Sequence, residues 1–174
     1  MTAIRRGCVH VYTGNGKGKT TAALGLALRA SGAGLRVAIQ QFLKNGDYSE
    51  IKALRKIGNI KVCQCGNKAF IKGRPSVSDF ECAKNGFEKA GEDIFSKKYD
   101  LVILDEVNVA MKLGLIATKE VMNLITNKPK TVELVLTGRG CPTVIKNAAD
   151  LVTEMREIRH PYQQGNCARR GIEY

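Results

Sequence analysis

The sequence predicts an α/β fold in which a mostly parallel β-sheet carries helices on both faces. Apolar, strand-like runs alternate with helical patterns along the whole chain. Several of these runs are apolar throughout, as in strands that are buried on both faces. The first run leads through a glycine-rich turn directly into a helical pattern. At 174 residues, we expect a single domain, residues 1–174, with a core of its own.

The individual elements follow from where the apolar runs begin and end. The expected strands are Cys8–Thr13, Arg36–Phe42, Ile60–Cys65, Leu101–Leu104, Val132–Thr137 and Leu151–Ile158. The expected helices are Thr20–Ser31, Ser49–Ile57, Ser78–Ser96, Val107–Leu113, Thr118–Thr126 and Pro142–Ala149. Gly32 and Gly34 suit the end of the first helix, and Pro142 suits the first turn of the last one. The least regular segment is Gly66–Val77.

The glycine-rich turn has the composition of a loop that binds phosphate groups. Its glycines let successive backbone N–H groups point inward, and the helix that follows adds the positive end of its dipole. Lys19 is placed to reach the phosphates, and Thr20 to offer its hydroxyl to Mg²⁺. We expect the nucleotide to be bound by Thr13, Gly14, Asn15, Gly16, Lys17, Gly18, Lys19, Thr20 and Thr21.

One position of this loop departs from the usual G-x-x-x-x-G-K-[ST] pattern. Thr13 stands where the first glycine would fall. The remaining glycines keep the loop flexible, so we expect phosphate binding to survive and the pose of the nucleotide to be what changes. The plain alternative is a glycine-rich surface turn, against which the flanking strand and helix argue.

Polar groups also follow two later strands, and ligands of open α/β sheets bind beyond the carboxyl ends of strands. The run Leu101–Leu104 ends in Asp105 and Glu106, carboxylates of the kind that Mg²⁺ needs beside a nucleotide. Alone, this pattern equally suits a helix start capped by Asp105. Arg139 follows the next strand between two glycines, where its guanidinium could grip a phosphate or simply face solvent. Arg29, on the first helix, is a further candidate with the same plain alternative.

Composition bounds the compartment and the partners. The net charge of +12 suits an anionic partner, but the basic residues are scattered, so a solvated basic surface is the plainer interpretation. No apolar run approaches the roughly 20 residues that a membrane span needs, and Met1–Arg6 is too short and polar for a signal peptide. We therefore expect a cytoplasmic protein without a membrane partner. The six cysteines contain no Cys-x-x-Cys pair and are interpreted mostly as small buried hydrophobes rather than disulfides.

Taken together, the motifs resemble those of the ATP:corrinoid adenosyltransferases of the P-loop type. The matching segments are Tyr12–Ala23, Leu104–Glu106, Thr137–Cys141 and Gly165–Tyr174. The resemblance implies a RecA-like P-loop NTPase fold, a homodimer, and transfer of the 5′-deoxyadenosyl group of ATP to the Co(I) of a reduced corrinoid, with release of triphosphate. It also implies that ATP lies reversed in the loop, and that a flavodoxin-like or flavin reductase supplies the electron.

The same resemblance implies a role for each site residue. Lys19 and Arg139 would supply positive charge to the departing triphosphate, with Glu106 as the third catalytic residue. Thr20 and Glu106 would hold Mg²⁺, and Asp105 would orient the groups around it. Asn15 and the loop glycines would supply hydrogen-bond donors.

The expected corrinoid-facing residues depart from the family pattern. Phe70 matches the first aromatic residue of the pocket that packs under the corrin ring. Lys72 stands where the family has a Trp, and the chain contains no Trp. The sequence therefore predicts a role for Phe70 and leaves the rest of the corrinoid pocket open.

Two other functions remain as alternatives. A nucleoside kinase resembling the thymidine kinases would also pair a phosphate loop with an Asp-Glu strand end, but those enzymes often carry zinc-spaced cysteine pairs. A RecA-like ATPase that binds nucleic acid would suit the net charge of +12. The chain lacks the basic segments interleaved with aromatic residues that such binding uses, so a nucleic-acid partner is not expected.

Overall fold

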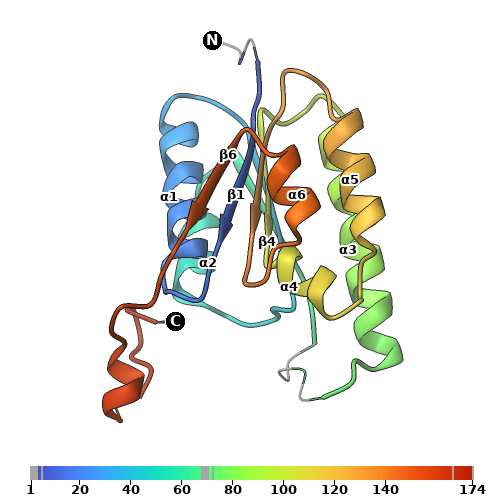
Figure 1. Ribbon diagram of the computed structural model, residues 1–174. Helices are drawn as coiled ribbons and strands as arrows, with labels where there is room; N and C mark the ends of the chain where they lie inside the picture. Colours follow the sequence, from blue (N-terminus) through green and yellow to red (C-terminus); the bar gives the residue numbers. More distant parts are fainter. Residues whose placement is uncertain (1–3, 5, 68–70, 72, 166, 174) are drawn as a thin grey trace.

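The computed structural model describes residues 4, 6–67, 71, 73–165 and 167–173. Six strands form one sheet in the order β3-β2-β4-β5-β1-β6 (Figure 1). Each neighbouring pair is parallel. The strands are β1 (Val9–Thr13), β2 (Val37–Phe42), β3 (Ile60–Cys65), β4 (Leu101–Asp105), β5 (Glu133–Thr137) and β6 (Leu151–Glu154). The expected parallel α/β fold is confirmed.

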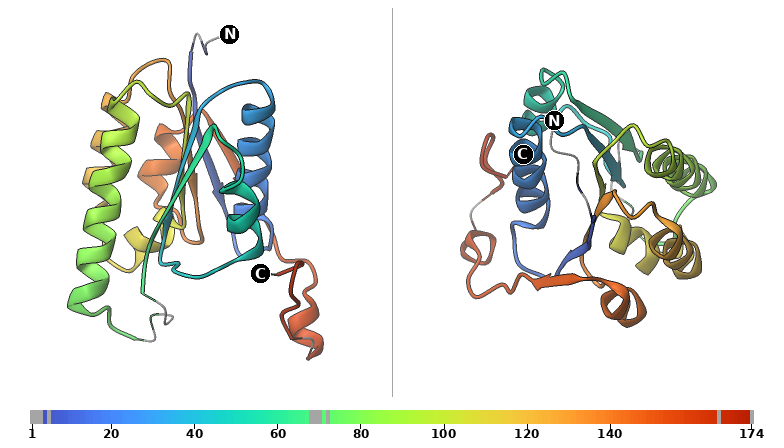
Figure 2. Two further views of the ribbon diagram at one scale, coloured as in Figure 1. Left: turned by 180° about the vertical axis from the view of Figure 1, so that it is seen from behind. Right: turned by 90° about the horizontal axis from the view of Figure 1, so that it is seen from above.

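The helices cover both faces of this sheet. They are α1 (Lys19–Gly32), α2 (Ser49–Leu54), α3 (Val77–Phe95), α4 (Val107–Lys112), α5 (Thr118–Asn127) and α6 (Thr143–Ala148), followed by the short 3₁₀ helix η1 (Pro161–Gln164). Helices α1 and α2 lie on one face, and α3 to α6 lie on the other (Figures 1 and 2). Because all neighbouring strands are parallel, all six strands end at the same edge of the sheet. The phosphate-loop segment begins at this edge (Figure 1).

The two helical layers enclose two apolar cores that share the strands. On the α1 side, Ala23 and Ala27 of α1 pack with Ile39 and Ile103. On the α3 side, the core includes Phe42, which is fully buried. Alternate residues of the central strands serve opposite cores, as the period of a strand requires. This double burial explains why the inner strands are apolar throughout.

The termini of the elements show where local sequence decided the structure. Helix α3 begins with a capping box, in which Ser76 accepts from the N–H of Asp79 and the Asp79 carboxylate accepts from the N–H of Ser76. The last strand ends at Glu154, and the predicted extension to Ile158 is wrong. At this point the chain leaves the sheet. The backbone N–H of Met155 donates a hydrogen bond to the carbonyl of Thr13, and its carbonyl accepts one from the N–H of Gly16 in the phosphate loop.

The interpretation of the cysteines needs correction. All six are free thiols, and no disulfide joins them. Only Cys141 is buried, whereas four are partly exposed and Cys167 is exposed. Cys63 and Cys65 lie on β3, which is at an edge of the sheet, and Cys82 lies on α3. Hydrophobic character alone therefore did not decide their burial.

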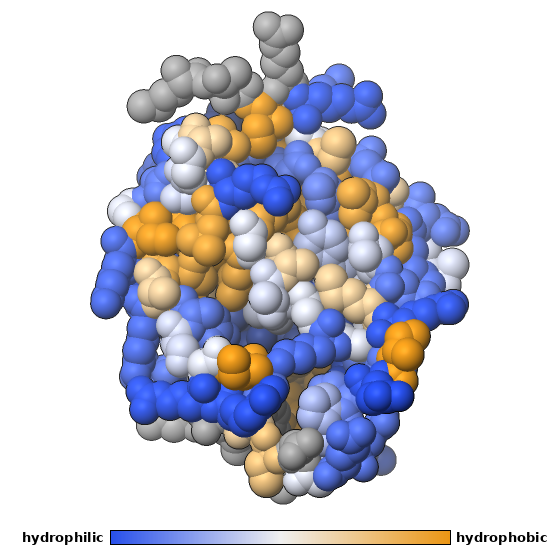
Figure 3. Space-filling view, turned by 90° about the vertical axis from the view of Figure 1, so that its left-hand side faces the viewer, coloured by the Kyte–Doolittle hydropathy of each residue, from blue (hydrophilic) through white to orange (hydrophobic). Residues whose placement is uncertain are grey.

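No helix among the described residues is long and apolar enough to cross a membrane. The face on the α1 side carries apolar patches that are interrupted by hydrophilic side chains (Figure 3). Leu28 of α1 is half exposed. This mixture agrees with charges that are dispersed over the surface.

Candidate functional site

The glycines of the loop between β1 and α1 are required by close packing as well as by backbone conformation. Gly14 and Gly18 have φ angles of +93° and +115°, which side-chain-bearing residues rarely adopt. A Cβ at Gly14 would lie 2.4 Å from the carbonyl oxygen of Met155, and one at Gly16 would lie 2.7 Å from the backbone of Arg156. The Gly16 N–H also donates to the Met155 carbonyl at 2.7 Å. The loop is thus held against the chain that follows β6.

Thr13 shows why the first glycine of the motif can be replaced. Its side chain is buried, and its hydroxyl accepts a hydrogen bond from the backbone N–H of Cys141 at 3.4 Å. The position therefore ties the phosphate loop to the loop that follows β5. A glycine could not make this link.

Lys19 is the first residue of α1, and its side chain is buried among the loop's own backbone. Its ammonium donates a hydrogen bond of 2.7 Å to the carbonyl oxygen of Gly16. Burial lowers the pKa of Lys19, the positive charge of Arg139 lowers it further, and Glu106 and Asp105 oppose the shift. The ammonium is thus a buried cation with few compensating contacts, and an arriving anion would be attracted to it.

Asp105, at the end of β4, is the centre of the polar network and is fully buried. One oxygen, Oδ1, accepts from the hydroxyls of Thr20 and Thr137 at 2.8 and 2.7 Å. The other, Oδ2, accepts from Gln41 at 3.1 Å and from the Lys44 ammonium at 2.9 Å. Four donors therefore occupy both carboxylate oxygens. Asp105 organises its neighbours and has no lone pair left for a further ligand.

Glu106 has a different environment from its neighbour. Its backbone lies in the left-handed region, with φ +63°, and its N–H donates to the Thr137 hydroxyl at 3.0 Å. Among the described residues, no hydrogen bond to its carboxylate is formed. Burial and then Asp105 raise the pKa of this carboxyl, while Lys44, Lys19 and Arg139 lower it. A carboxylate held in a strained backbone conformation without a donor is available to a ligand.

These groups face one cleft of about 670 Å³ at the carboxyl edge of the sheet. Such a volume suits a small-molecule ligand. Of the predicted residues, the cleft is lined by Gly16, Lys17, Gly18, Lys19, Thr20, Thr21, Glu106 and Arg139. Asp105 lies directly beneath it, bonded to Thr20. The loop, the end of β4 and the loop after β5 thus meet as the strand-end argument expected.

Several predicted residues do not line this cleft. They are Thr13, Gly14, Asn15 and Arg29. Thr13 and Gly14 support the loop from beneath, and Asn15 is exposed. Arg29 lies in the last turn of α1, ten residues beyond Lys19 and therefore about 15 Å along the helix. Phe70 lies outside the residues that the structure describes.

The cleft also contains residues for which the sequence analysis named no role. They are Leu24, Gly25, Leu28, Lys44, Ser49, Glu50, His160, Gly171, Ile172 and Glu173. Lys44 follows the carboxyl end of β2, and its position after a strand is therefore a signal that could have predicted its place in the cleft. His160, Ile172 and Glu173 are brought in by the C-terminal segment, and no local pattern places that segment beside the loop.

The C-terminal segment is bound to the phosphate loop through Lys17. The Lys17 ammonium donates to the carbonyl of Ile172 at 3.1 Å and to the Glu173 carboxylate at 3.0 Å. Arg169 holds the same carboxylate through its backbone N–H and its guanidinium. These donors lower the pKa of Glu173 to about 2, with the Arg169 side chain as the largest cause. Ion pairing therefore fixes the chain end beside the cleft.

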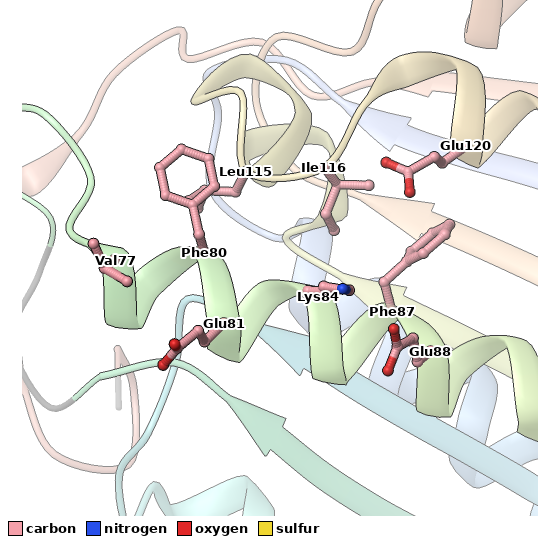
Figure 4. A pocket seen from close by; sticks show the side chains of 9 residues that line it. All are labelled: Val77, Phe80, Glu81, Lys84, Phe87, Glu88, Leu115, Ile116 and Glu120. Carbon is pink, nitrogen blue, oxygen red and sulfur yellow. The ribbon is translucent and has the colours of Figure 1, made fainter.

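A second cavity, of about 310 Å³, lies on the other face of the sheet. Phe80 and Phe87 project from α3 toward Leu115 and Ile116, between α4 and α5 (Figure 4). Its acidic residues, Glu81, Glu88 and Glu120, outnumber its single lysine, Lys84. This apolar and locally acidic cavity does not suit a polyphosphate, whereas the larger cleft is lined by Lys17, Lys19, Lys44 and Arg139.

Comparison with known proteins decides the family. A family model described as ATP:corrinoid adenosyltransferase BtuR/CobO/CobP matches residues 5–174. Corrinoid adenosyltransferases of Sinorhizobium sp. and Escherichia coli (strain K12) are each 34% identical to this chain over 97% of its length, covering 81% and 86% of their own lengths. The chain belongs to the ATP:corrinoid adenosyltransferase family.

A further relative is longer than this adenosyltransferase. An uncharacterized protein of Nostoc sp. is 36% identical over 89% of this chain, but the match spans only 45% of that protein. The family-level resemblance seen in the sequence is confirmed by these matches. The activity of the family is ATP-dependent adenosylation of corrinoids, and the kinase and nucleic-acid ATPase alternatives are not favoured.

Proposed function

We propose that the cleft above Asp105 binds ATP and that the cobalt of a reduced corrinoid attacks C5′ of its ribose. The electron pair of Co(I) forms the Co–C5′ bond, the C5′–O bond breaks, and the pair in that bond leaves with triphosphate. Cobalt is thereby oxidised from Co(I) to Co(III). Because the metal centre of the substrate is the nucleophile, no protein side chain needs to act as nucleophile or base. The protein contributes position and charge.

The observation that carries this proposal is the meeting of three loops at one cleft. Lys19 from the phosphate loop and Arg139 from the loop after β5 line it together. Their charges are close enough to interact, since the positive charge of Arg139 contributes to lowering the pKa of Lys19. In the proposal, both cations stabilise the negative charge of the departing triphosphate. Lys19 would exchange its hydrogen bond with the Gly16 carbonyl for one with a phosphate oxygen.

The donor set beside this cleft fits Mg²⁺. Thr20 offers a hydroxyl, and Glu106 offers a carboxylate that accepts no hydrogen bond from the described residues; both are hard oxygen ligands. When bound, the ion would neutralise part of the triphosphate charge. Asp105 holds the Thr20 hydroxyl in place and accepts from it at 2.8 Å. We therefore propose Thr20 and Glu106 as the direct ligands and Asp105 as the residue that orients Thr20.

The remaining parts of the proposal rest on family resemblance and chemistry. We propose a homodimer, which size-exclusion chromatography with light scattering would test. Co(I) is formed by reduction, so a flavodoxin-like or flavin reductase would deliver the electron. A cytoplasmic location agrees with six free thiols, one of them exposed. Phe70 would face the lower side of the corrin ring.

The experiment is incubation of the protein with Mg-ATP and chemically reduced cob(I)alamin. We expect a light-sensitive adenosylated product that forms only when protein, ATP and metal are all present. Arg139→Ala is the site variant, and the exposed Lys56→Ala is its matched control. Loss of product in the first and not the second supports the proposed cleft. Full product formation by Arg139→Ala would exclude this cleft as the place of charge stabilisation.

A further inference from the structure

Lys44 lies where a cation would be expected, although no motif of the sequence names it. It follows β2, and its side chain is 21% exposed. Its ammonium donates to Asp105 Oδ2 at 2.9 Å and to the Thr20 hydroxyl oxygen at 3.2 Å. Thr20 is a proposed ligand of the metal ion, and Asp105 is the strand-end carboxylate that orients it.

The charges of this arrangement are balanced without a metal. The Lys44 ammonium forms an ion pair of 2.9 Å with the Asp105 carboxylate. Its positive charge therefore compensates the buried carboxylate. A fully buried carboxylate needs such a partner, since an unpaired charge in the interior is costly.

The Lys44 ammonium and a metal ion would compete for the hydroxyl oxygen of Thr20. The Asp105 oxygens are already occupied by four donors, and Lys44 also approaches the oxygen of Thr20. A divalent cation that approached Thr20 would meet this positive charge at short range. Like charges at such a short distance repel even at a partly solvated site.

We propose that Lys44 is a positioning residue that occupies the cation position of the nucleotide-free enzyme, so that a divalent ion enters only together with a polyphosphate. This inference rests on the proposed ATP site. The phosphate oxygens of an arriving nucleotide offer the ammonium new acceptors within the same cleft, which Lys44 lines. The metal and the nucleotide therefore bind together. Metal without nucleotide does not displace the Lys44 ammonium.

Binding of free Mn²⁺ tests this directly, because Mn²⁺ takes the same oxygen ligands and its unbound fraction is measured by electron paramagnetic resonance. We expect nucleotide-free wild type to show no tight stoichiometric site. Lys44→Met and Lys44→Gln should bind free Mn²⁺ at least about tenfold more tightly, because the positive charge beside the Thr20 hydroxyl is removed. Lys52→Met, which removes an exposed lysine paired with Asp47, should bind like wild type.

Two outcomes overturn the proposal. One is a tight stoichiometric Mn²⁺ site in the nucleotide-free wild type, a measurement that needs no variant to fold. The other is unchanged Mn²⁺ affinity in a folded Lys44 variant, which would make Lys44 only a partner of buried Asp105. Thermal unfolding of each variant shows that it is folded, and Gln keeps a donor for the carboxylate. Failure here leaves the adenosylation assay unaffected, since Mn²⁺ binding is read without turnover.

Discussion

The hydroxyl of Thr20 donates a hydrogen bond of 2.8 Å to Asp105 across 85 residues of the sequence. This bond joins the first turn of α1 to the end of β4. Strand β5, which lies between β4 and β1 in the sheet, contributes Thr137 to the same carboxylate oxygen at 2.7 Å. A single buried carboxylate thus holds together three of the segments that form the cleft. Stability and function therefore meet at Asp105.

The first prediction concerns that carboxylate. Asp105→Asn should lower the free energy of unfolding by about 2–4 kcal/mol, because one oxygen is replaced by an amide N–H₂ that faces existing donors. Asp47→Asn, at a largely exposed ion pair, should change it by less than about 0.5 kcal/mol. Urea unfolding of the two variants measures both values. Equal, small effects would show that the network around Asp105 contributes little to the fold.

The second prediction separates catalysis from folding at Lys19. Its ammonium bonds only to the nearby Gly16 carbonyl among the described residues, so Lys19→Ala should leave the melting temperature within a few degrees of wild type. Turnover should fall by about 100-fold or more, because a cation that stabilises the leaving group is lost. Lys56→Ala, which removes an exposed lysine outside the cleft, is the control. Near wild-type turnover in Lys19→Ala would remove the loop from the nucleotide site.

The third prediction uses the pH dependence of Glu106. Burial and Asp105 raise the pKa of this carboxyl above its ordinary value of 4.5, so the folded state disfavours its ionised form. Its favourable contribution is present below pH 4.5 and is lost as the pH rises through the folded-state pKa. At pH 7, Glu106→Gln should therefore raise the melting temperature by about 2–4 °C while turnover falls.

The advantage of Glu106→Gln should shrink as the pH is lowered from 7 toward 4.5, because the wild-type carboxyl becomes protonated in this range. Melting curves from pH 4 to pH 8 measure this difference. Glu50→Gln, which also faces the cleft, serves as the comparison. A variant that is less stable than wild type at neutral pH would mean that the Glu106 carboxylate is held by favourable contacts.

The fourth prediction concerns Phe70 and comes from the sequence. An apolar ring beneath the corrin offers no donor atom and excludes water, which eases reduction of Co(II) to Co(I). Phe70→Ala should therefore cut activity with cob(II)alamin and a mild reductant, largely spare activity with pre-formed cob(I)alamin, and leave the melting temperature nearly unchanged. Phe95→Ala, at an exposed position on α3, is the control. Equal loss with both substrates and a lower melting temperature would make Phe70 structural.

The fold could be predicted because its signals are local and repeated. The six strands and six α-helices of the described residues were expected near their observed positions. The inner strands are apolar throughout because helices bury them on both faces, and this pattern is visible in the sequence. The edge strand β6 was overextended, because an exposed strand has no comparable signal and its end is set by the Met155 contact with the phosphate loop.

Site residues that directly follow strands could be predicted from the sequence. Residues that reach the cleft only through tertiary contacts could not. Lys19, Thr20 and Glu106 line one cleft as the strand-end argument expected. The C-terminal segment contacts the loop through the ion pair between Lys17 and Glu173, which are 156 residues apart. No local sequence pattern predicts this contact. Lys44 was missed although it follows a strand, because a lone lysine there matches no known motif.

The identity of the inorganic product distinguishes attack at C5′ of ATP from attack at a phosphorus atom. If C5′ is the electrophile, phosphorus NMR of a completed reaction with Mg-ATP and cob(I)alamin should show intact triphosphate, in an amount equal to the adenosylated corrinoid. The same measurement without corrinoid should show unchanged ATP. Accumulation of ADP and phosphate in proportion to turnover would contradict the account, because it would place the broken bond at a phosphorus atom.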